Sequence, residues 1–329
     1  MNRSLDILEH NRRLIESEMA LVEKGLRTLV NAAGPEIKAV GDYVFNGTGK
    51  RIRPALFFIA AYSPGVNLKP LVNAATALEL IHASSLLHDD VIDEAATRRG
   101  REAVRIRWSN KISILSGDYL LSSAFRMLAD YRSWPLIDLI INVVRDMSEG
   151  EMEQAFSDPL HPNLEERYFQ WIGKKSASFF AGCCKAGSLL GGENSDNQSD
   201  WHDFGYNLGI AFQLIDDLLD YTGSKVETGK PLYGDLNNRV LTLPLIRTLT
   251  VTGQAEPIEL ILQDRDASQR LMKSVAQAVL DGDGPSYTYH KAGEYAGRAK
   301  EALYRMEPLN LDKKQQLLQL VQDVLLRKK

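Results

Sequence analysis

Apolar residues recur at intervals of three and four along almost the whole chain, whereas the alternation of apolar and polar positions that marks strands is essentially missing. A period of 3.6 residues places such positions on one face of a helix. In the last third of the chain the repeating apolar positions are Ile258, Ile261 and Leu262, then Leu271, Val275, Ala278 and Val279, and finally Leu317, Leu320, Val321, Val324 and Leu325. The pattern therefore predicts an all-α protein.

Helix-stopping residues divide this pattern into ten or more predicted helices. Glycine, proline and asparagine favour turns, and clusters of them fall at 63–67, 157–163, 191–197, 282–286 and 306–310. Helices with apolar residues around most of their surface are buried, and we expect this of four segments, 69–95, 110–131, 135–156 and 201–223.

Chain length alone leaves the number of domains open, because 329 residues could form two domains of about 150 residues or one large domain. No internal repeat, low-complexity tract or linker rich in glycine, serine or proline interrupts the chain. We therefore predict a single domain over residues 1–329.

Composition places the chain among soluble globular proteins, with 44% hydrophobic and 25% charged residues. No stretch approaches the roughly 20 apolar residues that a membrane span needs. The charged start, MNRSLDILEHNRRL, lacks the apolar core of a signal peptide. The net charge of −4 is far from the basic excess of nucleic-acid-binding proteins. We expect a cytoplasmic protein with no membrane span and no nucleic-acid partner.

The two cysteines, Cys183 and Cys184, are adjacent in a predicted helix. Adjacent cysteines fit neither a disulfide framework nor the C-x-x-C spacing of metal and redox sites. We expect both to pack in the core of a protein from a reducing compartment.

A first group of aspartates, Asp89, Asp90 and Asp93, ends an otherwise apolar predicted helix. Residues four apart lie on one helix face, so Asp89 and Asp93 point the same way. Ser85 and His82 continue this polar stripe towards the start of the helix.

A second helix repeats the design in the sequence FQLIDDLLD. Gln213, Asp216 and Asp220 share one face, while an apolar face includes Phe204, Leu208 and Ile215. A solvated helix face could explain one such cluster, but two matching clusters among leucine, isoleucine and phenylalanine favour a functional site.

Crowded carboxylates raise one another's pKa unless a cation lies between them. The chain has no cluster of cysteine and histidine to suit zinc, whereas Mg²⁺ takes one or two carboxylates and completes its octahedron with water and phosphate oxygens. The rival interpretation is a di-iron site, which needs Glu-x-x-His on two helices. Only Glu79 and His82 form such a pair.

Basic residues supply groups that bind phosphate oxygens. GKRIRP contains Lys50, Arg51 and Arg53, and TRRGR, directly after the first aspartates, contains three arginines, Arg98, Arg99 and Arg101. Arginine offers a rigid fork of donors that matches phosphate. Lys175 and Lys230 are weaker candidates.

Together with an apolar interior, the two aspartate clusters and the basic residues predict a pocket for a diphosphate attached to an apolar chain. Cations in this pocket would stabilise the departing diphosphate.

With these residues the chain resembles a known family, the trans-type polyprenyl diphosphate synthases, over nearly its whole length. The matching motifs are GKRIRP (49–54), ELIHASSLLHDDVIDEA (79–95), TRRG (97–100), GDYLL (117–121), EGEMEQ (149–154), KSA (175–177), FQLIDDLLD (212–220), GKPLYGDL (229–236) and LTLPL (241–245). The stretch RWSNKISILSGDYLL is most similar to the larger, catalytic subunit of bacterial hepta- and hexaprenyl diphosphate synthases.

The resemblance implies a dimeric all-α bundle of the isoprenoid synthase type around a central cavity. It also implies Mg²⁺-dependent head-to-tail condensation of isopentenyl diphosphate onto an allylic diphosphate such as farnesyl diphosphate. The family places several Mg²⁺ ions, bridged to the allylic diphosphate, at Asp89, Asp93, Asp216 and Asp220.

The same resemblance implies roles for the remaining polar residues. Those that would hold the allylic diphosphate are Arg98, Lys175 and Lys230. Those that would hold isopentenyl diphosphate are Lys50, Arg53, His82 and Arg99. The dipoles of Ser176 and Gln213 would stabilise the allylic cation, and the departing diphosphate would remove the final proton.

The sequence departs from the family at three places. Ala96 replaces an acid that commonly precedes TRRG, and Ser176 stands where the family often has threonine. Arg239 and Val240 replace the usual Gly-Lys before LTLPL, so that a family lysine is absent.

Product length is expected to depend on the residues beneath the first aspartates. In short-chain members a bulky aromatic residue four or five positions before the first aspartate closes the cavity, and here those positions are Ser85 and Ser84. At about 1.5 Å rise per residue, Ser85 lies one turn beneath Asp89. We expect a product of C30–C40, used for a quinone side chain such as that of menaquinone.

The sequence is also compatible with two other functions. A class I terpene cyclase shares the fold type and one D-D-x-x-D cluster, but it does not need the GKRIRP cations. A catalytically silent subunit of a heteromeric synthase would have no reason to keep six crowded acids. The chain itself is expected to work as a homodimer or as a heterodimer with a small second subunit.

Overall fold

The computed structural model describes residues 12–46, 49–63, 65–223, 233–252, 269–306 and 309–327. Almost all of these residues are helical, so the predictions of an all-α protein and of ten or more helices are confirmed. The apolar positions Ile258, Ile261 and Leu262 lie outside the described residues.

Two compact units make up the chain. Among the described residues, the first, here called the amino-terminal unit, covers 12–141 and Cys183–Trp201, and the second, the carboxy-terminal unit, covers Asn142–Gly182 and the described residues after 201. The prediction of a single domain stays a prediction.

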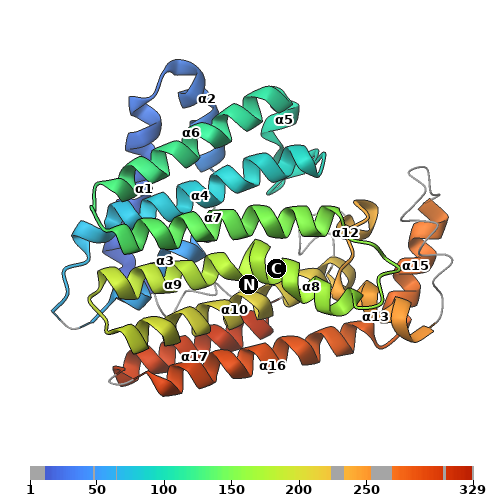
Figure 1. Ribbon diagram of the computed structural model, residues 1–329. Helices are drawn as coiled ribbons and strands as arrows, with labels where there is room; N and C mark the ends of the chain where they lie inside the picture. The colour runs from blue at the N-terminus through green and yellow to red at the C-terminus, as the bar shows by residue number, and fades with distance from the viewer. Residues whose placement is uncertain are drawn as a thin grey trace, which may run out of the picture. The chain divides into compact units, whose positions relative to one another are not determined.

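The amino-terminal unit contains α1 (Arg12–Ala32), α2 (Pro35–Phe45), α3 (Ile52–Ala61), η1 (Lys69–Leu71), α4 (Val72–Ile92), α5 (Val104–Arg107) and α6 (Asn110–Ala129). α4 and α6 lie side by side (Figure 1). From Ala74 to Ile81 every residue of α4 is buried, which confirms the predicted core helix. α4 begins three residues later than predicted because Lys69–Leu71 forms a 3₁₀ turn containing Pro70.

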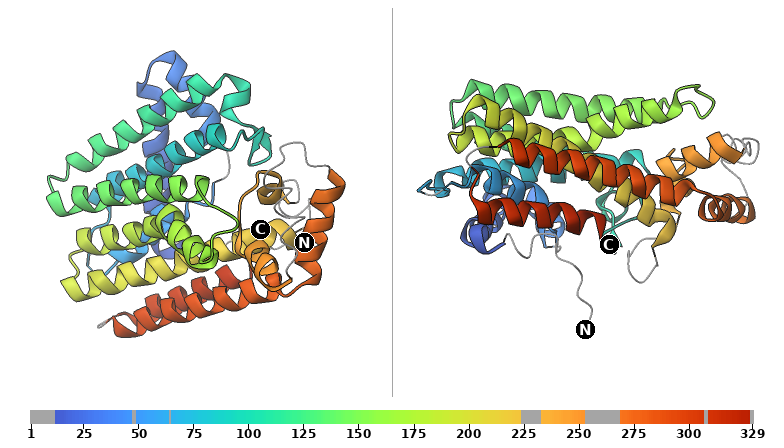
Figure 2. Two further views of the ribbon diagram at one scale, coloured as in Figure 1. Left: turned by 45° about the vertical axis from the view of Figure 1, so that its right-hand side comes forward. Right: turned by 90° about the horizontal axis from the view of Figure 1, so that it is seen from below.

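The carboxy-terminal unit contains α8 (Leu164–Ile172), η2 (Gly173–Ala177), α12 (Gly234–Asn237), α13 (Leu243–Thr252), α15 (Gln269–Asp281), α16 (Gly284–Arg305) and α17 (Leu311–Leu325). Figure 2 shows α16 alongside α17, the two helices nearest the carboxyl end. The core of this unit gathers aromatic and aliphatic side chains from α8, α13, α15 and α10 (Ser195–Thr222), among them Tyr168, Trp171, Leu214, Ile246 and Val279.

Three helices, α7 (Trp134–Ala155), α9 (Ser178–Leu190) and α10 (Ser195–Thr222), have residues in both units. α10 corrects one prediction, because it begins six residues before the predicted start at 201 and shortens the break expected over 191–197. The Cys183 and Cys184 side chains in α9 are buried and form no disulfide, which confirms their packing in the core.

The only sheet in the described part of the chain is a hairpin of β1 (Thr97–Arg98) and β2 (Arg101–Glu102). Its turn residues Arg99 and Gly100 have φ of 53° and 73°. Two-residue turns with positive φ match the twist of a hairpin. The basic run TRRGR therefore forms a tight hairpin after α4.

None of the helices within the described ranges is long and apolar enough to cross a membrane.

Candidate active site

The first aspartate cluster lies at the end of α4 and divides its three carboxylates between two directions. Asp90 is 2% exposed, whereas Asp89 and Asp93 are half-buried. One oxygen of Asp90 accepts hydrogen bonds from Arg98 Nε at 2.7 Å and pairs with Nη2 at 2.6 Å. The tight β1–β2 turn brings Arg98 back over the helix from which it came. Asp90 is therefore a structural partner of Arg98, and the two outer aspartates form the solvent-facing pair.

Arg51 is a buried hub beside this cluster. It has φ of 51°, at the amino end of α3, and only 8% of it is exposed. Its Nε lies 2.6 Å from Glu23 Oε1 and its Nη1 lies 2.6 Å from Glu79 Oε1. Although burial opposes the charge, the two carboxylates raise the pKa of Arg51. Glu79, half of the only Glu-x-x-His pair, is thus engaged by arginine, which argues against the di-iron interpretation.

A cavity of about 300 Å³ opens between α2, α4 and the hairpin. Three predicted substrate-binding residues, His82, Arg98 and Arg99, line it. Apolar side chains complete the wall, namely Val44, Phe45, Leu86, Leu87 and Val104. The cavity therefore combines cationic groups with an apolar surface, as a diphosphate ester requires.

The electrostatics of this region favour binding of an anion. Burial and the nearby charges of Arg53 and Arg99 lower the pKa of His82 well below its usual value, so His82 is neutral at physiological pH. Burial also lowers the pKa of Arg53, and the charge of Arg99 acts in the same direction. Lys50 is exposed just before α3. Positive charges crowded in this way gain from a bound polyanion.

The two residues expected to control product length differ in their surroundings. Ser84 is 2% exposed and its hydroxyl donates to the Gly117 carbonyl oxygen of α6 at 2.8 Å. Ser85 is half-buried and donates to the His82 carbonyl oxygen within α4 at 3.0 Å. Ser84 therefore faces the α4–α6 interface, and Ser85 lies on the side of the polar stripe.

The second aspartate cluster, on α10, repeats the division seen in the first. The middle residue, Asp217, is 4% exposed and accepts hydrogen bonds from Tyr168 Oη at 2.6 Å and from Gln213 Nε2 at 2.7 Å. Burial raises the pKa of Asp217 to about 7. The outer residues, Asp216 and Asp220, are partly exposed. In both clusters, then, the middle carboxylate is held inside the protein.

Neighbouring groups restrain the two outer aspartates of α10. Arg327 Nη1 lies 3.1 Å from Asp216 Oδ1. The two oxygens of Asp220 accept the backbone N–H groups of Gly234 and Asp235, both at 3.0 Å. A carboxylate has about four lone-pair directions, so these contacts orient Asp220 and leave it able to bind a cation.

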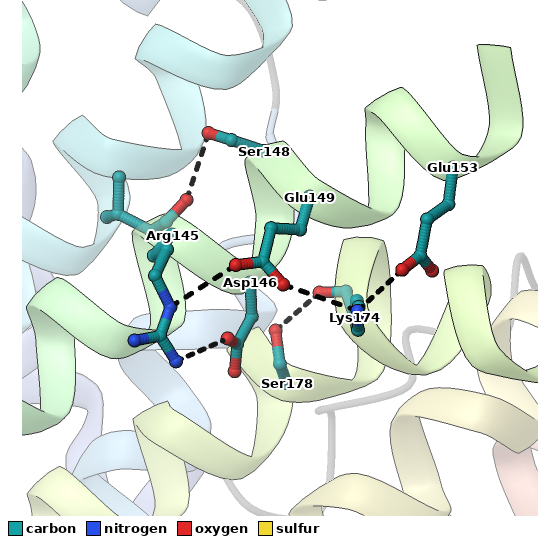
Figure 3. Close-up of polar contacts among 8 residues, drawn as sticks. Arg145, Asp146, Ser148, Glu149, Glu153, Lys174 and Ser178 are labelled. Carbon is teal, nitrogen blue, oxygen red and sulfur yellow. Dashed lines mark hydrogen bonds and ion pairs between the residues drawn. The ribbon is translucent and has the colours of Figure 1, made fainter. Parts of the chain in front are cut away.

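Lys174 and Lys175 lie in η2, a π-helical turn that packs against α7. Lys175 Nζ lies 2.6 Å from Glu151 Oε2 and donates to Gln154 Oε1 at 3.0 Å. Lys174 pairs instead with Glu149 and Glu153 (Figure 3). The motif EGEMEQ thus supplies separate partners to two adjacent lysines.

The next residue in η2, Ser176, donates from its hydroxyl to Gln213 Oε1 at 2.8 Å. The two residues predicted to stabilise an allylic cation are therefore in direct contact. π-Helical turns often occur at functional sites, and here the turn determines where Lys175 and Ser176 point.

The acidic residues fit magnesium better than a metal held by protein alone. Within the described residues, no three side chains of His, Cys, Asp or Glu converge closely enough to hold a metal ion. Each cluster instead offers two partly exposed carboxylates. This is the donor set of Mg²⁺ sites that rely on substrate phosphate and water for the remaining ligands.

Sequence reasoning missed Tyr168 and Glu151. In the sequence Tyr168 looks like any other aromatic residue of the core. The partners of Glu151 depend on the π-helical turn, which the sequence pattern does not show. Lys230 lies outside the described residues. Arg239, which stands near the missing family lysine, has φ of 60° in the turn after α12.

Comparison with known proteins gives a consistent picture. The polyprenyl synthetase family model matches residues 34–279. The chain is 32% identical to octaprenyl diphosphate synthase from Escherichia coli (strain K12), covering 90% of this chain and 92% of that protein. It is 30% identical to heptaprenyl diphosphate synthase component 2 from Geobacillus stearothermophilus, covering 88% and 90%.

A solved structure is similar over the full length of the chain. It is the polyprenyl synthase from Caulobacter crescentus CB15, complexed with calcium and isoprenyl diphosphate, at a TM-score of 0.92 and 29% identity, covering 100% of both chains. The family model spans well over half of the chain, and with these relatives it shows that the protein belongs to the polyprenyl synthetase family of prenyltransferases.

Proposed function

We propose that this protein is a Mg²⁺-dependent synthase that condenses isopentenyl diphosphate head-to-tail onto an allylic diphosphate such as farnesyl diphosphate. The observation that carries the proposal is the matched division within the two aspartate clusters. Asp90 and Asp217 are buried and bonded inside the protein, which leaves two partly exposed carboxylates in each cluster. We assign these outer residues, Asp89, Asp93, Asp216 and Asp220, to Mg²⁺.

The cationic residues would hold the two diphosphates. We assign the allylic diphosphate to Arg98, Lys175 and Lys230, and isopentenyl diphosphate to Lys50, Arg53, His82 and Arg99. The lining of the cavity by His82, Arg98 and Arg99 supports part of this assignment. A neutral His82 would act as a hydrogen-bond donor rather than as a charge.

In the proposed reaction the C–O bond of the allylic diphosphate breaks and its electron pair leaves with the diphosphate. Mg²⁺, when bound, would neutralise the charge that develops on this leaving group. Lys175 and Arg98 would do the same from the protein side. The double bond of isopentenyl diphosphate then attacks the allylic carbon, and loss of a proton to the departed diphosphate restores a double bond. Ser176 and Gln213 would stabilise the cation by their dipoles.

The expected product is an all-trans polyprenyl diphosphate of C30–C40, made in the cytoplasm for a quinone side chain such as that of menaquinone. The small side chains of Ser84 and Ser85 support a product longer than farnesyl. The resemblance to an octaprenyl diphosphate synthase supports the same range.

The active form would be a homodimer or a heterodimer with a small second subunit. The relative from Geobacillus stearothermophilus is named as one component of its synthase. This name supports a test of the present protein together with a second subunit.

An assay of the purified protein with Mg²⁺, farnesyl diphosphate and isopentenyl diphosphate tests the proposal. We expect release of diphosphate and a longer polyprenyl product, and no turnover when EDTA removes the metal. A hydrocarbon product would instead indicate a class I terpene cyclase. If nothing turns over, the assay is repeated with a candidate small subunit, and inactivity in its presence would contradict the proposal.

A further inference from the structure

Four polar groups in the carboxy-terminal unit form one continuous chain of hydrogen bonds. Tyr168 Oη donates to Asp217 Oδ2 at 2.6 Å, and Gln213 Nε2 donates to Asp217 Oδ1 at 2.7 Å. Ser176 Oγ then donates to Gln213 Oε1 at 2.8 Å. This chain of hydrogen bonds links α8, α10 and η2. It joins the buried phenol of Tyr168 to Gln213 and Ser176, the two residues proposed to stabilise the allylic cation.

The direction of each bond follows from the chemistry of the groups. The Tyr168 hydroxyl has a single hydrogen, and it donates this hydrogen to Asp217 Oδ2. A carboxylate only accepts. In its ionised form Asp217 therefore accepts at both oxygens, at Oδ2 from the Tyr168 hydroxyl and at Oδ1 from the amino end of the Gln213 amide.

This orientation determines what Ser176 presents. With Gln213 Nε2 committed to Asp217, the amide oxygen faces Ser176 and accepts its only hydroxyl hydrogen. The Ser176 oxygen then carries lone pairs alone on its remaining side. If the amide were reversed, its NH₂ group would face Ser176 and its oxygen would face the Asp217 carboxylate, which is repulsive.

Packing holds the Tyr168 end of the chain in place. Tyr168 is 1% exposed, and its ring makes edge contacts with Phe169 and Trp171 at centroid distances of 5.4 and 5.6 Å. These contacts involve the ring and not the hydroxyl group. Removing the hydroxyl therefore tests the hydrogen-bond chain while the packing is kept.

We propose that Tyr168 is a positioning residue: acting through Asp217, it orients the Gln213 amide so that Ser176 offers only lone pairs to the allylic cation. This inference rests on the proposed function, because Ser176 and Gln213 stabilise a cation only if the enzyme forms one. Residues that orient the ligands of a metal site commonly change metal affinity or activity by about 10- to 100-fold, and we expect an effect of the same order from Tyr168.

The test compares Tyr168→Phe and Asp217→Asn with the wild-type enzyme in the prenyl transfer assay. We expect kcat to fall about tenfold in Tyr168→Phe and about 100-fold in Asp217→Asn, since asparagine can donate to Gln213 and permit the reversed amide. KM for both diphosphates and the Mg²⁺ concentration for half-maximal rate should stay within about twofold, because an interaction made only in the transition state lowers kcat alone.

Tyr287→Phe is the matched control, because Tyr287 also donates to a carboxylate, Glu165 Oε1, at 2.6 Å, and Glu165 is not one of the four hydrogen-bonded groups. Its kcat should equal that of the wild type. A second readout is the ratio of rates with farnesyl diphosphate and its 2-fluoro analogue, in which fluorine destabilises the cation. This ratio should increase in Tyr168→Phe and not in Tyr287→Phe.

An unchanged kcat in Tyr168→Phe would overturn the inference, as would a lower kcat with an unchanged fluorine ratio, which would mark a merely structural role. If Tyr168→Phe does not fold, the test uses Asp217→Asn alone. The inference is then overturned if the ratio of rates with farnesyl diphosphate and its 2-fluoro analogue is unchanged in Asp217→Asn. Failure of the proposed function is separate, because then the wild-type enzyme itself would make no polyprenyl product.

Discussion

Gly150 of α7 lies directly against the backbone of Lys175. A Cβ atom built on Gly150 would fall 2.5 Å from Lys175 N and 2.8 Å from Trp171 O. Real side chains essentially never approach that closely. The absence of a side chain at Gly150 therefore allows α7 and the π-helical turn to meet, and it places Lys175 within reach of Glu151 and Gln154.

Gly150→Ala should destabilise the protein by about 1–3 kcal/mol, since overpacking against backbone forces the elements apart. Urea denaturation monitored by circular dichroism measures the free energy of unfolding. The control is Gly297→Ala in α16, where a Cβ meets nothing within 4 Å. That variant should be more stable by about 0.5–1 kcal/mol, from helix propensity alone. Equal effects of the two substitutions would contradict the close approach at Gly150.

Glu79→Gln should destabilise the protein by about 3 kcal/mol, because it removes a charge from a buried pair and leaves Arg51 with Glu23 as its remaining carboxylate. The control is Asp42→Asn, which breaks the exposed Lys38–Asp42 pair. Such surface pairs contribute about 0–1 kcal/mol. If Glu79→Gln unfolded at the wild-type urea concentration, Arg51 would not depend on this pair.

Substitution of the middle and outer aspartates should have different effects. Asp89→Asn should raise the Mg²⁺ concentration needed for half-maximal rate by about tenfold or more, while unfolding changes little, because this residue is assigned to the metal. Asp90→Asn should instead lower the free energy of unfolding, by about 1–3 kcal/mol, because it weakens the charged hydrogen bonds from Arg98. Titration with Mg²⁺ and urea denaturation of the same samples separate the two outcomes.

Phenylalanine at the two serines beneath Asp89 should also act differently. Ser85→Phe should shorten the product without loss of stability, since Ser85 is half-buried and its hydroxyl bonds only within α4. Ser84→Phe should destabilise the protein by about 1–3 kcal/mol, because the side chain is packed against Gly117 of α6. Chromatography of the dephosphorylated products gives chain length. Unchanged length in both variants would show that these positions do not close the cavity.

The buried cysteines should resist thiol reagents in the native protein. Burial raises the pKa of the Cys183 thiol far above its usual range, so that almost no reactive thiolate is present at pH 8. Labelling by a chromogenic disulfide reagent should be slow in buffer and should reach two thiols per chain in urea. Rapid labelling of the folded protein would mean that α9 opens far more readily than its packing indicates.

Much of the site could be predicted from helix periodicity. The spacing of Asp89 and Asp93, and of Gln213, Asp216 and Asp220, places each set on one face whatever the helix packs against. The helical class, the buried helix α4 and the buried cysteines follow from equally local patterns, whereas the predicted core helices over 110–131 and 135–156 are wrong in part, because α6 and α7 expose Leu115 and Ile141. The start of α10 at Ser195 was missed because its first turn is polar and carries no apolar signal.

Contacts between distant segments could not be predicted in the same way. Helix spacing separates the middle aspartate of each cluster from the outer pair, but only the tertiary structure shows what holds the middle ones, by giving Asp90 to Arg98 and Asp217 to Tyr168. Likewise, nothing local separates Lys174 from Lys175, whose partners differ because a π-helical turn changes the direction of successive side chains. Periodicity is a property of one helix, whereas a hydrogen bond between helices depends on how closely their backbones approach, as at Gly150.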